Sequence, residues 1–311
     1  MQDAPLFSVI MPMYNAASTV AEAIESVLAQ TCADWELVVA DNASTDTGPG
    51  IVSHYAATRQ NILLLPSTVN SGGPASPRNR AIASARGRYL AFLDADDLWE
   101  PIKLERMSAV LAAGVDVAYH DVLYFGGSIH RTHRFPAVPA NVRRFLVFRG
   151  NVLCNSATVA SRSRVVALGG FDEREQYNTA EDYDLWLRFA RDGARFAHVP
   201  EVLGGVRISE GSLSARHDYH AQRACNVMQD HLQDMRDRGE IGSLVAFHGR
   251  QRALASRDCH VGTRMTRAGR DREALVLYFS SARHCPWYGY SWCGIGLSLA
   301  RLAQKCIRKK C

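Results

Sequence analysis

From residue 6 to residue 121, short apolar runs alternate with segments whose apolar residues recur at helical spacing. Successive parallel strands need a crossover connection, and a helix usually supplies it. The alternation is therefore typical of an α/β fold with a mostly parallel sheet flanked by helices. We expect strands at Phe7–Met11, Trp35–Ala40, Ile62–Leu65, Arg88–Leu93 and Val115–Asp121.

The segments between these runs predict amphipathic helices. From Val20, apolar residues recur at i, i+3, i+4, i+7 and i+8, and Thr19 with Glu22 has the spacing of a capping box. We expect further helices at Ile51–Ala57, at Pro77–Arg86 and from about Pro101.

Beyond residue 121 the pattern changes twice. Residues 122–160 are irregular, and a strand, a turn and a helix follow at Ala157–Ala160, Gly169–Glu173 and about Ala180–Arg191. From about residue 216 onward only helical patterns remain. We therefore expect an α/β domain over residues 1–215 and a helical C-terminal region over residues 216–311.

The two regions differ in charge. Residues 221–311 carry 16 Lys+Arg against 7 Asp+Glu, a net charge of +9, and the remaining 20 against 24 give −4 for residues 1–220. The first residues lack a basic and apolar leader pattern. Because no uncharged run reaches the roughly 18–20 residues of a membrane-spanning helix, we expect a cytoplasmic protein.

Acidic residues follow two of the expected strands. Asp41 ends the second strand, and Asp94, Asp96 and Asp97 follow the fourth. A single Asp at such a place is most often an Asx-turn or a helix cap. Three carboxylates within four residues repel one another, however, and a bound cation relieves that repulsion.

Oxygen ligands of this kind favour Mg²⁺ or Mn²⁺, and Mg²⁺ commonly shares its coordination with phosphate oxygens. Because the carboxyl ends of parallel strands meet at one edge, both acidic groups suit a nucleotide diphosphate there. The sequence has neither a Walker A nor a GxGxxG loop. P-loop NTPases and dinucleotide oxidoreductases are therefore disfavoured.

A third group of carboxylates begins the helix that contains Leu185 and Phe189 on one face. Glu181 and Asp182 can simply stabilise the positive end of this helix. A carboxylate at a helix start that faces a cleft can also act as a general base, and the two interpretations are compatible.

Four motifs, in this order, resemble glycosyltransferase family 2, whose members are inverting nucleotide-sugar transferases with a GT-A fold. The resemblance extends over roughly residues 6–215, and the motifs are SVIMPMYN, VVADNASTD, PRNRAIASARGRYLAFLDADDLW and AEDYDLWLR. It implies a Rossmann-like GT-A domain with the C-terminal helices as an appendage.

The resemblance also implies roles for individual residues. Asp41 matches the carboxylate that binds the nucleotide base, and Asp182 matches the catalytic base, with Glu181 beside it. In the DxD element, Asp94 and Asp96 bind the donor, and Asp96 and Asp97 hold Mg²⁺ or Mn²⁺. The remaining donor-binding positions are Pro12, Tyr14, Asn15 and Arg207; Ser212 lies with Arg207 in the segment expected to close over the donor.

Two departures bear on the activity. Asn42 stands where the family usually has a second Asp, and the QxxRW signature of processive synthases is missing. We therefore expect transfer of a single hexose, from a UDP-sugar in preference to other donors, to a saccharide or lipid-linked acceptor of a cell-surface polysaccharide. A non-catalytic carbohydrate-binding or partner-binding module and a nucleotidyltransferase are the alternatives.

The C-terminal region contains an uncharged, aromatic-rich segment, Cys285–Ala300, which is followed by basic residues. Either its aromatic residues pack against a core, or the segment lies on an anionic membrane surface and makes the protein peripheral on the inner face. The arginines before it are dispersed and no nucleic-acid-binding module is recognisable, so nucleic acid is disfavoured as a partner.

Overall fold

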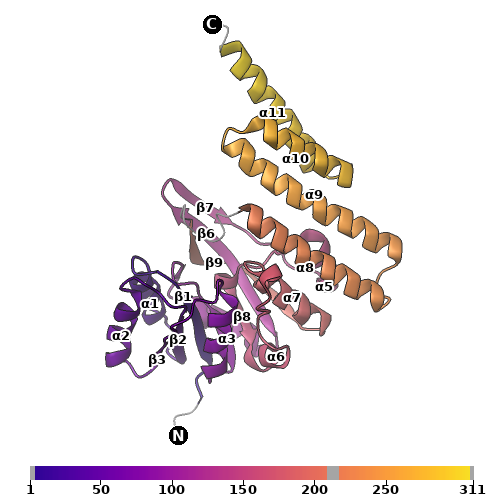
Figure 1. Cartoon of the computed structure of the whole chain (residues 1–311). Helices are drawn as coiled ribbons and strands as arrows, with labels where there is room; N and C mark the ends of the chain where they lie inside the picture. Colours follow the sequence, from indigo (N-terminus) through magenta and orange to yellow (C-terminus); the bar gives the residue numbers. More distant parts are fainter. Residues whose placement is uncertain (1–3, 209–216, 309–311) are drawn as a thin grey trace. The chain divides into compact units, whose positions relative to one another are not determined.

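The computed structural model describes residues 4–208 and 217–308. The chain forms two compact units, of which the first comprises residues 1–145 and 151–211 and the second residues 146–150 and 212–311. In Figure 1 the first unit runs from indigo to pink and contains the sheet, and the orange and yellow helices belong to the second.

A mixed β-sheet is the centre of the first unit. Its strands are β1 (Phe7–Met13), β2 (Trp35–Asp41), β3 (Ile62–Leu65), β4 (Tyr89–Phe92), β5 (Leu98–Trp99), β6 (Val117–Gly126), β7 (Ile129–His133), β8 (Thr158–Ser161) and β9 (Phe196–Arg207). Over the described residues the order is β3-β2-β1-β4-β8-β6-β9-β5, and β7 pairs with β6. The β3-β2-β1-β4 half is parallel, and β8 joins it antiparallel to β4.

Six helices of the described residues flank this sheet: α1 (Val20–Leu28), α2 (Gly48–Thr58), α3 (Ala75–Ser84), α4 (Lys103–Ala112), α6 (Arg162–Ala167) and α7 (Glu181–Arg191). The division between the two units falls within α5 (Val142–Arg149). Because side chains alternate along a strand, β1 presents Phe7, Val9 and Met11 to the core shared with α1, α2 and α4. On the other face, the Phe92 ring lies 5.9 Å from that of Trp186 in α7.

The expected GT-A-type α/β fold with C-terminal helices is confirmed, whereas several local predictions are wrong. The capping box predicted for Thr19 and Glu22 does not form. Thr19 precedes α1 without a side-chain cap bond, and its hydroxyl donates to the Ala16 carbonyl (3.4 Å). The Glu22 carboxylate pairs with Arg207. The irregular segment after residue 121 contains most of a hairpin: β6 continues to Gly126 and turns back as β7. The sequence analysis did not predict β5, β9, α5 or α6 either.

Four helices make up most of the second unit: α8 (His217–Asp237), α9 (Ser243–Arg267), α10 (Asp271–His284) and α11 (Gly289–Arg308). A small core lies between α9, α10 and α11, with Tyr278 and Ile295 at its centre. A Cβ on Gly294 would overlap the Tyr278 ring, so glycine is what lets α11 approach α10. Among the described residues, no helix is long and apolar enough to cross a membrane.

Candidate active site

Two loops meet beyond the carboxyl ends of β1 and β2. The strands run parallel with Met13 opposite Asp41, so the residues after them lie side by side. Asn15 holds the loops together, because its backbone N–H donates to Ser44 Oγ (2.9 Å) and its Oδ1 accepts from the Thr45 N–H (2.8 Å). Asn15 has a φ of 48°, a conformation that Asn tolerates better than most residues.

The predicted base-binding residues lie at this edge. Pro12 is near the end of β1, Tyr14 follows it and is 52% exposed, and Asp41 is buried. The Asp41 carboxylate accepts from the Ser44 N–H (3.1 Å), and the backbone carbonyl of Asp41 accepts from the Arg80 guanidinium. The turn role of Asp41 is therefore present, and it leaves carboxylate lone pairs for a further donor.

The loop before α3 connects this edge to the segment that precedes α7. The Asn42 Oδ1 accepts from both the N–H and the hydroxyl of Ser71 (3.0 Å each), and the Asn178 amide donates to the Gly72 carbonyl (2.9 Å). Asn42, the departure from the usual Asp, also donates through its amide nitrogen to Asn70 Oδ1 (3.3 Å) and to the Gly73 carbonyl (3.4 Å), and an ionised carboxylate could not donate these two bonds.

The acidic turn after β4 points its carboxylates in different directions. Asp94 is partly exposed and accepts from the Arg78 guanidinium (2.6 Å). The pKa of Asp96 is raised to about 6, first by burial and second by the charge of Asp94. Asp97 is buried, and burial together with Asp96 and Asp94 raises its pKa well above the usual range. Burial and the neighbouring carboxylates thus disfavour the ionised forms of Asp96 and Asp97.

Ser156 hydrogen bonds to the acidic turn and to the residues packed behind it. Its hydroxyl accepts from the Asp94 N–H (3.1 Å), and its carbonyl accepts from Trp99 Nε1 (2.9 Å) and from Lys103 Nζ (2.7 Å). Lys103 is fully buried, with Nζ 3.6 Å from the Trp99 ring centroid, and burial lowers the pKa of its ammonium well below the usual value.

Arg207, the last residue of β9, closes the acidic turn from the side. Its backbone N–H donates to Asp97 Oδ1 (2.8 Å), and its Nε donates to the Asp96 carbonyl (2.9 Å). The guanidinium also pairs with Glu22 of α1 (2.5 Å) and lies over the Phe125 ring. The predicted donor-binding residue Arg207 therefore does lie beside Asp96.

A buried guanidinium connects the acidic turn to the start of α7. Arg78 of α3 forms ion pairs with Asp94 and Glu181, and both the Arg78 and the Glu181 side chains are at least 95% buried. The second Glu181 oxygen, Oε2, is buried and has no hydrogen-bond partner. Buried ion pairs need good geometry to offset the cost of desolvating their charges. Arg78 therefore restricts the position of β4 relative to α7.

Asp182, the predicted base, lies at the start of α7 and is partly buried. Its Oδ2 accepts from the Asn151 amide (3.2 Å), and its Oδ1 accepts from the Tyr183 N–H (2.7 Å). Burial, and next the charge of Glu181, raises the pKa of Asp182 to about 7. A carboxylate with this pKa is half ionised near neutral pH, which suits general-base catalysis.

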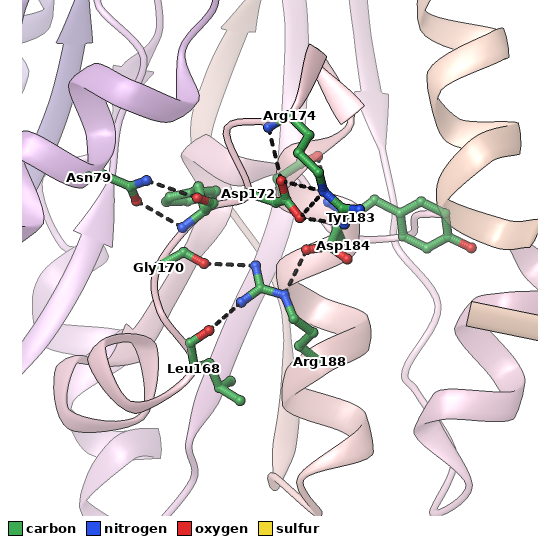
Figure 2. Close-up of polar contacts among 10 residues, drawn as sticks. Asn79, Leu168, Gly170, Asp172, Arg174, Tyr183, Asp184 and Arg188 are labelled. Carbon is green, nitrogen blue, oxygen red and sulfur yellow. Dashed lines mark hydrogen bonds and ion pairs between the residues drawn. The ribbon is translucent and has the colours of Figure 1, made fainter. Parts of the chain in front are cut away.

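The first turns of α7 are held in place by the turn at Gly169–Glu173. Figure 2 shows the Arg188 guanidinium donating to Asp184 and to the carbonyls of Leu168 and Gly170, each at 2.7 Å. This arrangement ties the carbonyls of the turn to the same helix that carries Asp182.

The same turn is also tied to α3. Asn79 and Phe171 exchange two hydrogen bonds, each 2.8 Å long, from side chain to backbone (Figure 2). Gly170 has a φ of 72°, and a Cβ there would overlap the Asn79 side chain. The turn therefore needs glycine for its backbone conformation and for its approach to α3.

Most predicted site residues therefore lie at one sheet edge, linked through α3. Asp41, Asp97 and Glu181 are the buried carboxylates of this set, and each is engaged by other side chains or backbone groups. Among the described residues, no group of three His, Cys, Asp or Glu side chains is arranged to hold a metal ion. Ser212 lies outside the described residues.

Arg78, Asn151 and Ser156 are site residues that the sequence motifs did not single out. Arg78 lies within a quoted motif, and a basic residue in the helix before an acidic strand end could have been assigned as its ion-pair partner. Asn151 and Ser156 lie in an irregular segment, where nothing in the sequence pattern distinguishes them from ordinary loop residues.

The chain matches the family model described as Glycosyl transferase family 2 over residues 8–168. It is 31% identical over 232 residues to UDP-Glc:alpha-D-GlcNAc-diphosphoundecaprenol beta-1,3-glucosyltransferase WfgD of Escherichia coli, which covers 74% of this chain and 87% of that protein. It is 31% identical over 221 residues to succinoglycan biosynthesis protein ExoO of Rhizobium meliloti (strain 1021), with 68% and 63% covered.

Two solved structures are similar in fold. S. aureus TarS 1–349 in complex with UDP-GlcNAc matches with a TM-score of 0.59 and 19% identity over 98% of this chain and 92% of that one. Mannosyltransferase PcManGT from Pyrobaculum calidifontis, in complex with GDP-Man and Mn²⁺, matches with a TM-score of 0.59 and 22% identity over 99% and 89%.

Proposed function

The chain belongs to glycosyltransferase family 2, and we propose that it transfers a single hexose from a UDP-sugar, with inversion, to a saccharide or lipid-linked acceptor. The observation that carries this proposal is the Asp94–Arg78–Glu181 connection, because it joins the end of the DxD strand to the helix that begins with Asp182. A donor held at β4 therefore lies next to a carboxylate able to accept a proton.

We assign the donor to the edge formed by β1, β2 and β4. Asp41 is the hydrogen-bond acceptor for the base, and the loop of Pro12, Tyr14 and Asn15 lines its pocket. Asp94 and Asp96 face the ribose and diphosphate end. Arg207 lies at the same turn, where its positive charge favours an anionic ligand.

The residues present fit a divalent cation that is completed by the donor. Asp96 is the half-buried carboxylate of the turn that does not pair with Arg78, and a cation beside it would relieve its repulsion from Asp94. We propose that Asp96 holds Mg²⁺ or Mn²⁺ together with diphosphate oxygens, and that Asp97 braces the turn from inside. When bound, the cation would neutralise charge on the departing diphosphate.

In the reaction, the oxygen of an acceptor hydroxyl forms a bond to the anomeric carbon of the donor sugar. The bond between that carbon and the diphosphate oxygen breaks, and the electron pair leaves with the nucleoside diphosphate. Asp182 removes the hydroxyl proton, Asn151 holds its carboxylate by a hydrogen bond, and the charge of Glu181 raises its pKa. Direct attack from the opposite face produces inversion.

The acceptor and the location are the finer parts of the proposal. The similar Escherichia coli protein is named for a diphosphoundecaprenol acceptor, and the similar Rhizobium protein for succinoglycan biosynthesis. We propose, by this similarity, that the chain acts in cell-surface polysaccharide assembly at the inner face of the membrane.

A donor screen tests this function. Thermal shift with UDP should be larger with Mn²⁺ than with EDTA, and hydrolysis of UDP-sugars should exceed that of GDP-sugars and dTDP-sugars. Equal UDP shifts with and without the cation would refute the metal proposal. Release of pyrophosphate in place of UDP would identify a nucleotidyltransferase.

An acceptor assay tests the base. Asp182→Asn keeps the shape of the side chain but removes the proton acceptor, so transfer should fall by about 10² to 10⁴ with UDP affinity nearly unchanged. Glu181→Gln serves as the comparison for a purely local charge effect. An Asp182→Asn variant that melts like the parent and keeps most of its transfer activity would remove Asp182 from this role.

A further inference from the structure

Helix α11 turns its apolar side outward. Its inward side is made of small residues: Ser291, Gly294 and Ser298 are buried beside Ile295, and Ser291 and Ser298 hydrogen bond to hydroxyl groups of α10 and α9. The large residues at this end of the chain face solvent: Trp287 is 85% exposed, Tyr290 73%, Leu297 55%, Trp292 53% and Leu299 51%.

The part of α11 that precedes Arg301 has no charged residue on its outward side. Between His284 and Arg301 the sequence has no charged residue. Arg301 and Lys305, the next charged positions, reach back to the backbone carbonyls of Thr266 and Gly269. An exposed apolar surface without charges is unusual for a protein surface that stays in water and marks an interaction site.

The C-terminal stretch that contains this surface has an excess of basic residues: after Glu273 the sequence has six Lys and Arg residues and no acidic residue. Among the described residues, Asp271 offsets part of this charge, because its carboxylate pairs with Lys305 Nζ (2.5 Å) and lies 3.7 Å from Arg301 Nε. Such a surface is complementary to an anionic partner. A two-fold contact with a second copy would instead bring like charges together, which opposes association.

We propose that the outward face of α11, together with the adjoining Trp287, rests on an anionic lipid bilayer. Exposed Trp and Tyr side chains prefer the depth of lipid headgroups, and basic residues beside an apolar helix face are attracted to anionic lipids. No helix needs to cross the bilayer for this attachment. The inference deepens the proposed function, since a lipid-linked acceptor lies in such a surface.

Two of the five tryptophans report directly on this contact. Trp287 and Trp292 are exposed, whereas Trp35, Trp99 and Trp186 are each at least 92% buried. Mixing the full-length chain with phosphatidylglycerol vesicles should shift tryptophan emission to shorter wavelength and carry the protein down with the vesicles. Added salt should weaken both effects, and phosphatidylcholine vesicles should produce little of either. No donor or acceptor is needed, so this result is independent of sugar transfer.

Substitutions distinguish the contact of α11 with the bilayer from the tryptophan emission that reports it. Trp287→Ser with Leu297→Ser, and separately Leu297→Glu, should each lower vesicle binding at least about tenfold. Val166→Ser is the control, because Val166 is an exposed apolar residue of the first unit. Trp287→Phe with Trp292→Phe should still sediment with vesicles but lose the emission shift. Melting curves establish that each variant is folded.

Several outcomes would overturn the proposal. Folded Leu297→Glu that binds phosphatidylglycerol vesicles like the parent would show that the α11 face is not the contact. Equal binding to neutral vesicles would exclude the role of charge. Concentration-dependent dimerisation that Leu297→Glu abolishes, without vesicle binding by the parent, would assign the face to a second copy. Retention on DNA in place of vesicles would assign it to nucleic acid.

Discussion

Removing the Asn151 side chain should shift the pH dependence of transfer. The Asn151 amide donates to Asp182 Oδ2 at 3.2 Å and so stabilises the ionised carboxylate. Asn151→Ala removes this donor, and the pKa of Asp182, which is about 7 in the parent, should rise. Since the ionised carboxylate is the active form, the variant should lose activity on the acid side of its pKa and not on the alkaline side.

The magnitude follows from the hydrogen bond. Bonds to charged groups contribute about 1.5–3 kcal/mol, but this one is long and its donor is exposed, so about 1 kcal/mol is appropriate, or a pKa increase of roughly 0.7. At pH 7 the ionised fraction would fall from about one half to about one sixth, a threefold loss of rate. At pH 9 both forms would be almost fully ionised, and the rates should agree within about 10%.

Single-turnover transfer rates between pH 5.5 and about 9.5 measure this effect without a contribution from product release. Asn61→Ala is a suitable control, because Asn61 lies at the start of β3 and donates to the Trp35 carbonyl, away from Asp182. In an Asp182→Asn background, adding Asn151→Ala should have little further effect. A rate loss of the same factor at every pH would refute the reasoning, because it would place Asn151 in a purely structural role.

Three further results are expected. Asp41→Asn keeps an acceptor for the Ser44 N–H but loses the charge that we propose binds the base, so isothermal titration should show UDP affinity about tenfold or more lower, and an unchanged Kd would remove Asp41 from the pocket. Arg188→Met removes the guanidinium that pairs with the buried Asp184 and donates to the Leu168 and Gly170 carbonyls, and it should cost about 3–5 kcal/mol in chemical denaturation; a loss below about 1 kcal/mol would contradict this. Gly87→Ala should destabilise by about 1–3 kcal/mol, because its Cβ would overlap the backbone of Phe7 and Ser8, whereas Gly50→Ala in α2 meets open space and should stabilise by about 0.5–1 kcal/mol; equal melting temperatures for these two variants would show that backbone proximity is not limiting.

The parallel half of the sheet was predictable because each of its strands can be identified from its own residues. Residues Trp35–Asp41 are all buried and nearly all apolar, and helical patterns flank them. β9 carries no such signal, since it contains Pro200, Gly204 and Gly205. Its conformation depends on β6, against which it runs with two register shifts, and on close contacts: a Cβ on Gly205 would lie 2.8 Å from the Phe125 ring.

In the site, too, some residues could be predicted from the strand pattern and others depend on contacts between distant parts of the chain. Asp41 and Asp94 were predictable because parallel strands bring their carboxyl ends to one edge, and that argument needs only strand positions. The role of Arg78 depends on a contact with Glu181, which is 103 residues away along the chain. Pairs at this separation are decided by how helices pack on the sheet, and neither residue has a periodic pattern that identifies its partner.

The Arg78 contacts explain why the two halves of the proposed reaction need a rigid connection. Asp94 belongs to the donor side and Glu181 adjoins the base, and both carboxylates would repel each other without the guanidinium between them. Arg78 therefore lets Asp94 and Glu181 lie close together, while Arg207 lies beside Asp96. Because Glu181 is held by Arg78, its charge remains beside Asp182 and, after burial, is the main contribution to a pKa near 7. The ion pair that positions the helix thus also helps set the pH at which the base can act.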